Sequence, residues 1–155
     1  MTIFNREDAR TVLPQLEKQL NNSITDVNNV LDNIGKVYYD SSSKTISTAG
    51  IDNTPVQGAT IKLPKGHAYV IIGQWTFNTG SSSTTRNNQI VIKDITNNAN
   101  RSTQRIMYAD QSFAVMQAMY ITGVLKADTQ FAVCASSSMT YTTASNNFIE
   151  AICIK

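Results

Sequence analysis

The chain has 155 residues and a net charge of +2, and only 15% of its residues are charged, against about 25% in ordinary soluble domains. That length allows one compact domain, or one small domain with an appendage. Its polarity comes from Thr, Asn, Ser and Gln, which fill 56 of the 155 positions and favour strands and turns. The basic residues are scattered singly, which argues against a nucleic-acid surface. No apolar run approaches the about 18 residues of a membrane-spanning helix.

An amphipathic helix is predicted near the N-terminus, over residues 14–34. Pro14 suits the first turn of this helix and Gly35 its C-terminal cap. Apolar residues recur at alternating spacings of three and four, which is a heptad pattern broken only by Ser23. Because its β-branched residues favour three or more chains, we expect a coiled coil over residues 14–37, with packing inside one chain as the alternative. The expected interface positions are Leu16, Leu20, Val27, Val30, Ile34 and Val37.

A β-rich head is predicted after a linker at residues 38–59. From residue 60 to the end, apolar runs of strand length are separated by turn signals, with no helical interludes, which indicates an all-β sandwich, jelly roll or barrel. The final run, residues 148–155, is apolar on both faces, which predicts a central strand. The expected strands are 60–63, 69–77, 89–95, 105–109, 113–125, 129–135, 139–143 and 148–154.

In the predicted β domain, the stretches 69–77 (YVIIGQWTF), 88–92 (NQIVI), 114–133 and 152–155 (ICIK) carry a resemblance that covers most of residues 60–155. With the short N-terminal coiled coil before them, they resemble the trimeric fibre-head proteins of bacteriophages. The heads of those proteins are similar to the jelly roll of tumour necrosis factor and of the complement globular heads. The resemblance implies a mainly β homotrimer, with a coiled-coil helix and a jelly-roll head, displayed on a virion. It also implies that the final strand lies near the threefold axis, with Ile152 and Ile154 at the subunit interface.

No catalytic, cofactor or metal site is predicted. His67 is the only histidine, and no Gly-x-Ser-x-Gly elbow accompanies it, so an ordinary loop histidine is expected. Cys134 and Cys153 lie in apolar alternating runs and are expected to be buried, reduced thiols. The acidic residues are single and mostly at turns, so no carboxylate pair for glycoside cleavage is indicated. Glu150, within an apolar strand, is expected to be a partnered structural charge near a subunit boundary.

Receptor contacts are expected on loops, because binding residues are commonly carried on loops that a rigid scaffold positions. The polar loops at residues 81–86, 97–101 and 136–138 are the candidates. Trp75 and Phe77 share one face of a predicted strand with Tyr69 and are therefore expected in the core. The candidates for exposed aromatic residues are Tyr108, Tyr120 and Tyr141, and the candidate receptor-binding residues are Arg86, Asn100, Arg101 and Tyr141.

The expected function is that of a virion fibre protein that is made in the host cytoplasm without a signal peptide. Residues 1–13 are too short to fold alone and form the expected anchor, with residues 1–12 binding a phage capsid or tail protein. The trimeric head would bind a host-surface glycan or wall polymer through several weak sites acting together. Two alternatives stay open: a glycan-cleaving enzyme on the same scaffold, and a ligand-free capsid decoration or adaptor protein. No cofactor, nucleic acid or membrane insertion is expected.

Overall fold

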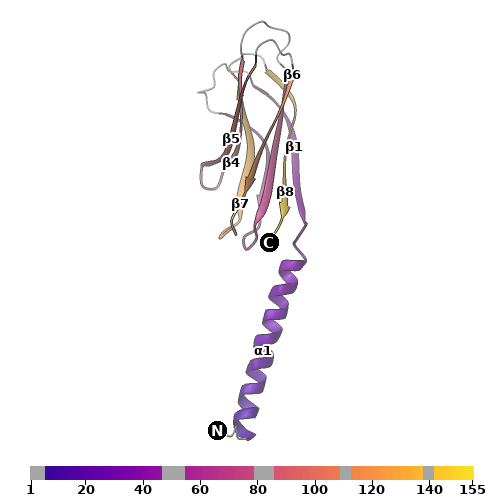
Figure 1. The fold of residues 1–155 in the computed structure, drawn as a ribbon, viewed down its shortest axis with the longest axis vertical. Helices are drawn as coiled ribbons and strands as arrows, with labels where there is room; N and C mark the ends of the chain where they lie inside the picture. The colour runs from indigo at the N-terminus through magenta and orange to yellow at the C-terminus, as the bar shows by residue number, and fades with distance from the viewer. Residues whose placement is uncertain (1–5, 47–54, 79–85, 109–112, 138–141) are drawn as a thin grey trace. The chain divides into compact units, whose positions relative to one another are not determined.

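The chain divides into two compact units, Met1–Ile34 and Gly35–Lys155, in a computed structural model. In the described residues, the first unit contains one helix and the second contains eight strands (Figure 1). The structure describes residues 6–46, 55–78, 86–108, 113–137 and 142–155.

The helix of the first unit is α1 (Arg6–Leu31), and it begins well before the predicted start. Pro14 lies inside α1, so the prediction that it occupies the first turn is wrong, and much of the expected anchor is helical. The segment before Pro14 contains good helix formers, among them Arg10 and Leu13. This segment therefore extends the helix although proline removes one main-chain donor. After Leu31 the chain turns, and Gly35 has a φ of 81°, as expected of a C-terminal cap.

Two polar residues of α1 have hydrogen-bond partners within the helix. Every described side chain from Arg10 to Leu31 is exposed. The hydroxyls of Ser23 and Thr25 donate to the carbonyl oxygens four residues earlier, at 3.0 and 2.9 Å, which gives each of them a local partner. These two hydroxyl groups thus need no tertiary contact, whereas the apolar residues of the helix are exposed.

The second unit is an antiparallel β-sandwich (Figure 1). Its strands are β1 (Val37–Ile46), β2 (Val56–Leu63), β3 (Tyr69–Asn78), β4 (Arg86–Asp94), β5 (Ala99–Tyr108), β6 (Phe113–Ile121), β7 (Thr129–Ser137) and β8 (Thr142–Cys153). Sheet A has the order β1-β8-β3-β6, and sheet B has the order β2-β7-β4-β5. The first strand thus pairs with the last, the second with the seventh, the third with the sixth and the fourth with the fifth, which is a jelly-roll arrangement. The predicted mainly β sandwich is confirmed.

The predicted linker at residues 38–59 is wrong, because most of β1 and the start of β2 lie within it. Val37, predicted as a heptad position of the coiled coil, instead begins β1 and pairs with Ile152 of β8. A polar contact ties β1 to sheet B, where the Asp40 carboxylate accepts the main-chain N–H of Thr60 at 2.8 Å. The middle of β1 is polar (DSSSK), so it lacks the apolar alternation by which the other strands were predicted.

Other strand boundaries also differ from the prediction. The two predicted C-terminal strands form one strand, β8, although residues 139–141 lie outside the described residues. β5 begins at Ala99, so the predicted loop at 97–101 is largely strand. β6 ends at Ile121, and residues 122–128 connect it to β7. β8 lies between β1 and β3, which confirms its predicted central position in a sheet.

The core lies between the two sheets. Tyr69, Trp75 and Phe77 are buried on the inward face of β3, as predicted, and burial of side chains of this size contributes roughly 1.5–3 kcal/mol each. Cys134 and Cys153 are buried and unpaired, which confirms the prediction for both thiols. Burial raises the pKa of Cys134 to about 11, so this thiol stays protonated at neutral pH.

Asn147 connects the two sheets from the buried side of β8. Its Oδ1 accepts the Ser42 hydroxyl of β1 at 3.0 Å and the main-chain N–H of Ala59 in β2 at 2.8 Å. Gly58 makes room for this contact, because a Cβ at that position would meet the Asn147 side chain and the Trp75 ring. Position 58 of β2 therefore requires a glycine, because the main chain there passes close to the Asn147 side-chain amide.

Candidate functional site

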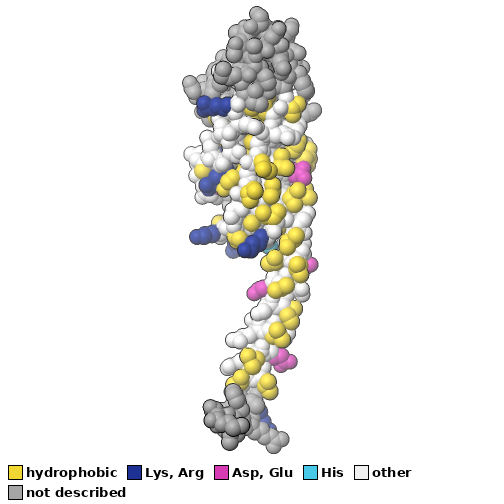
Figure 2. All heavy atoms as spheres, viewed as in Figure 1, with side chains coloured by type: hydrophobic (Ala, Val, Ile, Leu, Met, Phe, Trp, Pro, Cys, Tyr) yellow, Lys and Arg dark blue, Asp and Glu magenta, His cyan; other side chains and the backbone are white. Residues whose placement is uncertain are grey.

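The apolar residues of α1 form an exposed row along the helix (Figure 2). Of the predicted interface positions, Leu16, Leu20, Val27 and Val30 lie on α1, with between 38% and 60% of each residue exposed. Ile34 follows the helix and is 50% exposed. Most helices of proteins gain their stability by packing an apolar face. This row is therefore a contact surface without a partner in the described first unit.

The outer face of sheet A is the second apolar surface, and strand pairing arranges its side chains in rows across the four strands. One row contains Val37, Ile152, Val70 and Ile121. Val37 and Ile121, on the two edge strands of the sheet, are each more than half exposed. Ile154, just past the end of β8, is also exposed. Two predicted interface residues, Val37 and Ile152, thus belong to one apolar face.

The next row of this face contains Tyr39, Glu150, Ile72 and Met119. Tyr39 and Met119 are each 60% exposed, and Glu150 is half-buried between them. The ion pairs of the described residues do not include Glu150. Contiguous exposed apolar surfaces of this kind mark contact sites on proteins. We call the two rows together the sheet A face.

A pocket of about 320 Å³ lies at one end of the sandwich. Asp94, the last residue of β4, lines it with a side chain that is only 3% exposed. Arg101 of β5 donates to the Asp94 carboxylate from Nε at 3.2 Å and from Nη2 at 2.8 Å. Asn97, in the turn between these strands, donates its main-chain N–H at 3.0 Å and its side-chain amide at 2.8 Å. We call this the end pocket.

The contacts of Asp94 decide its ionisation. Burial by itself raises the pKa of the Asp94 carboxyl, but the hydrogen bonds from Asn97 and Arg101 outweigh burial and lower that pKa. The hydrogen bond to Asp94 raises the pKa of Arg101 in turn. Both groups are therefore charged at neutral pH, and the pair has no net charge.

The connection between β6 and β7 forms another wall of the end pocket, and it is tied to the turn before β3. The hydroxyl of Thr122 accepts the main-chain N–H of Tyr69 at 2.9 Å. The N–H of Leu125 donates to the His67 carbonyl at 3.0 Å, and the N–H of Gly66 donates to the Leu125 carbonyl at 2.8 Å. These hydrogen bonds hold the wall in place.

Tyr120 also lines the end pocket, and sequence reasoning placed it differently. It was expected to be exposed, but it is half-buried on the inward side of β6, with its ring 6.3 Å from the ring of Phe131.

The sequence analysis identified Asp94 only as a single carboxylate at a turn. The signal for the Asp94 contacts is the spacing Asp94-x-x-Asn97 in a turn, which is typical of a side chain that bonds main-chain groups just after it.

The structure does not bring the four predicted receptor residues together. Arg101 lines the end pocket. Asn100 is its exposed neighbour on β5 and is outside the pocket lining. Arg86 begins β4, at the other end of the strand from Asp94, and its side chain lies outside the described residues, as does Tyr141.

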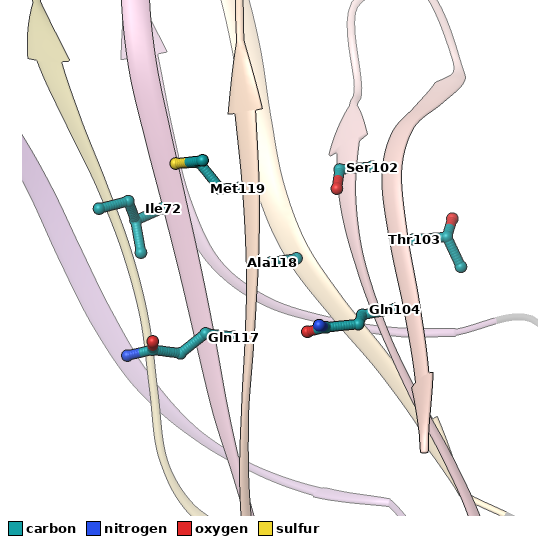
Figure 3. A pocket seen from close by; sticks show the side chains of 7 residues that line it. All are labelled: Ile72, Ser102, Thr103, Gln104, Gln117, Ala118 and Met119. Carbon is teal, nitrogen blue, oxygen red and sulfur yellow. The ribbon is translucent and has the colours of Figure 1, made fainter.

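Another hollow, of about 390 Å³, lies beside the edge strands β5 and β6 (Figure 3). Met119 and Gln117 point to the side of β6 on which Ile72 lies, whereas Ala118 points toward β5 (Figure 3). No charged side chain lines this hollow, so it offers no fixed charge to a ligand. Its lining residues are Ile72, Ser102, Thr103, Gln104, Gln117, Ala118 and Met119.

His67 lies in the turn before β3, half-buried, with its ring 6.4 Å from that of Tyr69. Across the described ranges, no three His, Cys, Asp or Glu side chains gather as metal ligands. No helix in the described part of the chain is long and apolar enough to cross a membrane.

No protein-family model matches the chain, and no curated protein matches it. Among solved structures, it is similar to VP2 of infectious bursal disease virus in a subviral particle, with 11% identity and a TM-score of 0.51 over 76% of this chain. VP2 from a mutant T=1 particle and from the Gx strain of the same virus each match with 10% identity and a TM-score of 0.50. The chain covers 32% of each VP2 chain. At this identity the likeness shows a shared β-sandwich fold.

Proposed function

We propose that the chain is a virion structural protein, a homotrimeric bacteriophage fibre whose head attaches the particle to a host-cell surface. The observation that carries the proposal is the sheet A face, a largely apolar surface that a single chain leaves exposed. Together with the apolar row of α1, this face is assigned to contacts between copies of the chain. The likeness of the sandwich to VP2 from viral particles supports a structural role in a virion.

The apolar row of α1 favours three copies over two. Within α1, Val27 and Val30 place β-branched side chains at both core positions of the heptad, and this combination favours trimers or larger assemblies. In the head of the proposed trimer, Ile152 of the central strand β8 faces the neighbouring copies, because it lies on the sheet A face. The two surfaces then bury their apolar side chains in one assembly.

Host attachment in this proposal is multivalent. Three heads act together on a surface glycan or wall polymer, so that weak single sites give a strong combined attachment. Residues 1–12 join the fibre to a capsid or tail protein. The protein is made in the host cytoplasm and becomes part of the virion.

The first test is the solution mass of the full-length chain by light scattering. We expect about three times the chain mass of 17.0 kDa. The double variants Leu20→Asp/Val27→Asp and Met119→Asp/Ile121→Asp each place charges in one apolar surface, and each is expected to lower the mass. The matched control Asn22→Asp, on the polar side of α1, is expected to leave the mass unchanged. A wild-type chain that is monomeric at micromolar concentration would overturn the proposal.

The second test is binding of the fluorescently labelled full-length trimer to cells of the host. Binding is expected to be saturable and to persist when residues 1–12 are deleted, whereas incorporation of the deletion variant into particles is expected to be lost. A trimer that enters particles but binds no cells would leave the ligand-free decoration protein as the function and reject attachment.

A further inference from the structure

We propose that the end pocket binds an acidic saccharide unit, a polyhydroxylated ring that carries a carboxylate or phosphate group. The biological meaning of this assignment rests on the proposed role in host attachment, and it adds a site and a ligand class to that role. The pocket volume of about 320 Å³ is at the lower end of the range of small-ligand sites. It therefore suits a short saccharide unit rather than a long buried chain.

The charges that line the end pocket favour an anion. Asp94 and Arg101 neutralise each other at 2.8 Å, and Lys126, which also lines the pocket, adds a positive charge. Asp128, two residues after Lys126, does not line the pocket. Its carboxylate pairs with Lys62 at 3.5 Å. The described lining residues thus have a net charge of one positive unit.

Arg101 is held in position for a ligand before one binds. Two of its five N–H donors go to Asp94, and the Asp94 carboxylate is held in turn by Asn97. The remaining guanidinium donors therefore have a fixed orientation. Donors that are ordered in advance lose little entropy on binding, and a guanidinium matches the planar geometry of a carboxylate or phosphate.

Hydroxyl groups in the pocket wall suit a polyhydroxylated ligand. The Thr96 hydroxyl accepts the main-chain N–H of Gln130 at 2.9 Å, and the Thr122 hydroxyl accepts that of Tyr69 at 2.9 Å. Each hydroxyl keeps its own hydrogen for a second partner. Sugar hydroxyls both donate and accept hydrogen bonds. They can therefore accept a hydrogen bond from each threonine hydroxyl.

Tyr120 supplies the flat apolar surface that a sugar ring needs for its C–H face. Its ring is half-buried beside Phe131, so its orientation is constrained by packing while its hydroxyl end stays polar. Tyr120 points inward from β6, whereas Met119 and Ile121 point outward, as strand alternation requires. The end pocket and the sheet A face therefore use opposite sides of one strand, and occupancy of one does not block the other.

The test is titration of the full-length protein by calorimetry, with defined probes. The acidic probes are 3′-sialyllactose, a hyaluronan tetrasaccharide and a glycerol phosphate oligomer, and lactose is the matched neutral probe for the first. At least one acidic probe is expected to bind, to exceed lactose by about tenfold in affinity, and to weaken as salt rises. Absence of binding by all three would overturn the proposal. Equal competition by inorganic phosphate would also overturn it, by showing a general anion site.

Two variants locate the binding. Lys126→Gln, at an exposed position, and Tyr120→Leu are each expected to weaken the bound acidic probe by about tenfold. Arg105→Gln is the matched control, because Arg105 is an exposed cation of β5 that does not line the pocket, and its affinity is expected to match the wild type. Affinity unchanged in Lys126→Gln, with melting temperature also unchanged, would reject the site.

Measuring the solution mass alongside binding distinguishes failure of the end pocket proposal from failure of the fibre proposal. A trimer that binds none of the acidic probes rejects only the end pocket assignment. A monomer that binds an acidic probe through Lys126 rejects only the trimeric fibre.

Discussion

At the scale of single residues, Asp94 stands out because its carboxylate is buried and charged. Its partners, Asn97 and Arg101, come from the turn and strand that directly follow it. A buried charge that loses its partner is costly, because the remaining group is then desolvated without compensation. Removing one member of the pair is therefore expected to destabilise the fold.

The stabilisation by Asp94 is expected to depend on pH. Its pKa is lower in the folded chain than the value of about 3.9 in an unfolded one, so the charged form stabilises the fold above that value. This stabilisation is lost as pH falls through the lower folded pKa. Asp94→Asn is expected to reduce the free energy of unfolding at pH 7 by about 2 kcal/mol and to flatten its decline in acid.

Thermal unfolding at stepped pH measures both effects. Asp26→Asn, at an exposed carboxylate of α1, serves as the control and is expected to change stability little. If Asp94→Asn retained the wild-type acid profile, Asp94 would not be the group whose protonation weakens the fold.

Residue-scale features divide into those that alternation reveals and those that depend on register. Trp75 and Phe77 were placed in the core because apolar residues two apart share one face of a strand. The contact of Arg101 with Asp94 depends instead on how β4 and β5 pair, with Asp94 opposite Ala99. The sequence analysis placed the second of these strands at residues 105–109, so this pairing was missed and Arg101 was found only as a cation near a turn.

At the scale of elements, α1 is notable because it continues through Pro14. Proline in a helix interior costs about 3 kcal/mol relative to alanine. Pro14→Ala is therefore expected to increase the helix signal in circular dichroism and to raise the melting temperature of the full-length protein. Asn22→Ala, which changes helix propensity alone, is expected to give a smaller increase.

An unchanged signal in Pro14→Ala would contradict a helix that passes through this residue. It would place Pro14 in the first turn, where its ring costs little.

Elements with a regular apolar period were predicted well, and elements without one were missed. β3 and β7 alternate or are apolar throughout, and they lie close to their predicted bounds. β1 contains the run Ser41-Ser42-Ser43 and was taken for a linker. It is held by its neighbours, including the contacts of Asp40 and Ser42 with β2 and β8, and such contacts are invisible in the sequence around it.

At the scale of the whole molecule, the sheet A face exists only because strands that are far apart in sequence are paired. β1, β8, β3 and β6 lie side by side, so Tyr39 and Met119 share a row with Glu150 and Ile72. The resemblance to bacteriophage fibre-head proteins predicted a jelly roll, and it implied that Ile152 lies at the subunit interface. It did not predict Met119 or Ile121, because the pairing of β6 with β3 cannot be read from a strand alone.

Glu150 offers a test of how copies would meet on the sheet A face. It is the one described acidic residue in the two rows. Burying a charged carboxylate without a partner is costly, since the desolvation cost is not recovered. In the proposed trimer, Glu150 is therefore expected to pair with a cation of a neighbouring copy, which agrees with its predicted place at a subunit boundary.

Glu150→Gln is accordingly expected to weaken trimer association by about 2 kcal/mol or more, measured by sedimentation over a dilution series. Gln117→Ala, on the same side of β6 but without a charge, is the control and is expected to have a much smaller effect. The wild-type trimer is expected to dissociate more readily as salt rises, whereas Glu150→Gln loses part of that dependence. Tighter association of Glu150→Gln would mean that no cation faces Glu150, and the sheet A face would then meet the neighbouring copy through its apolar residues alone.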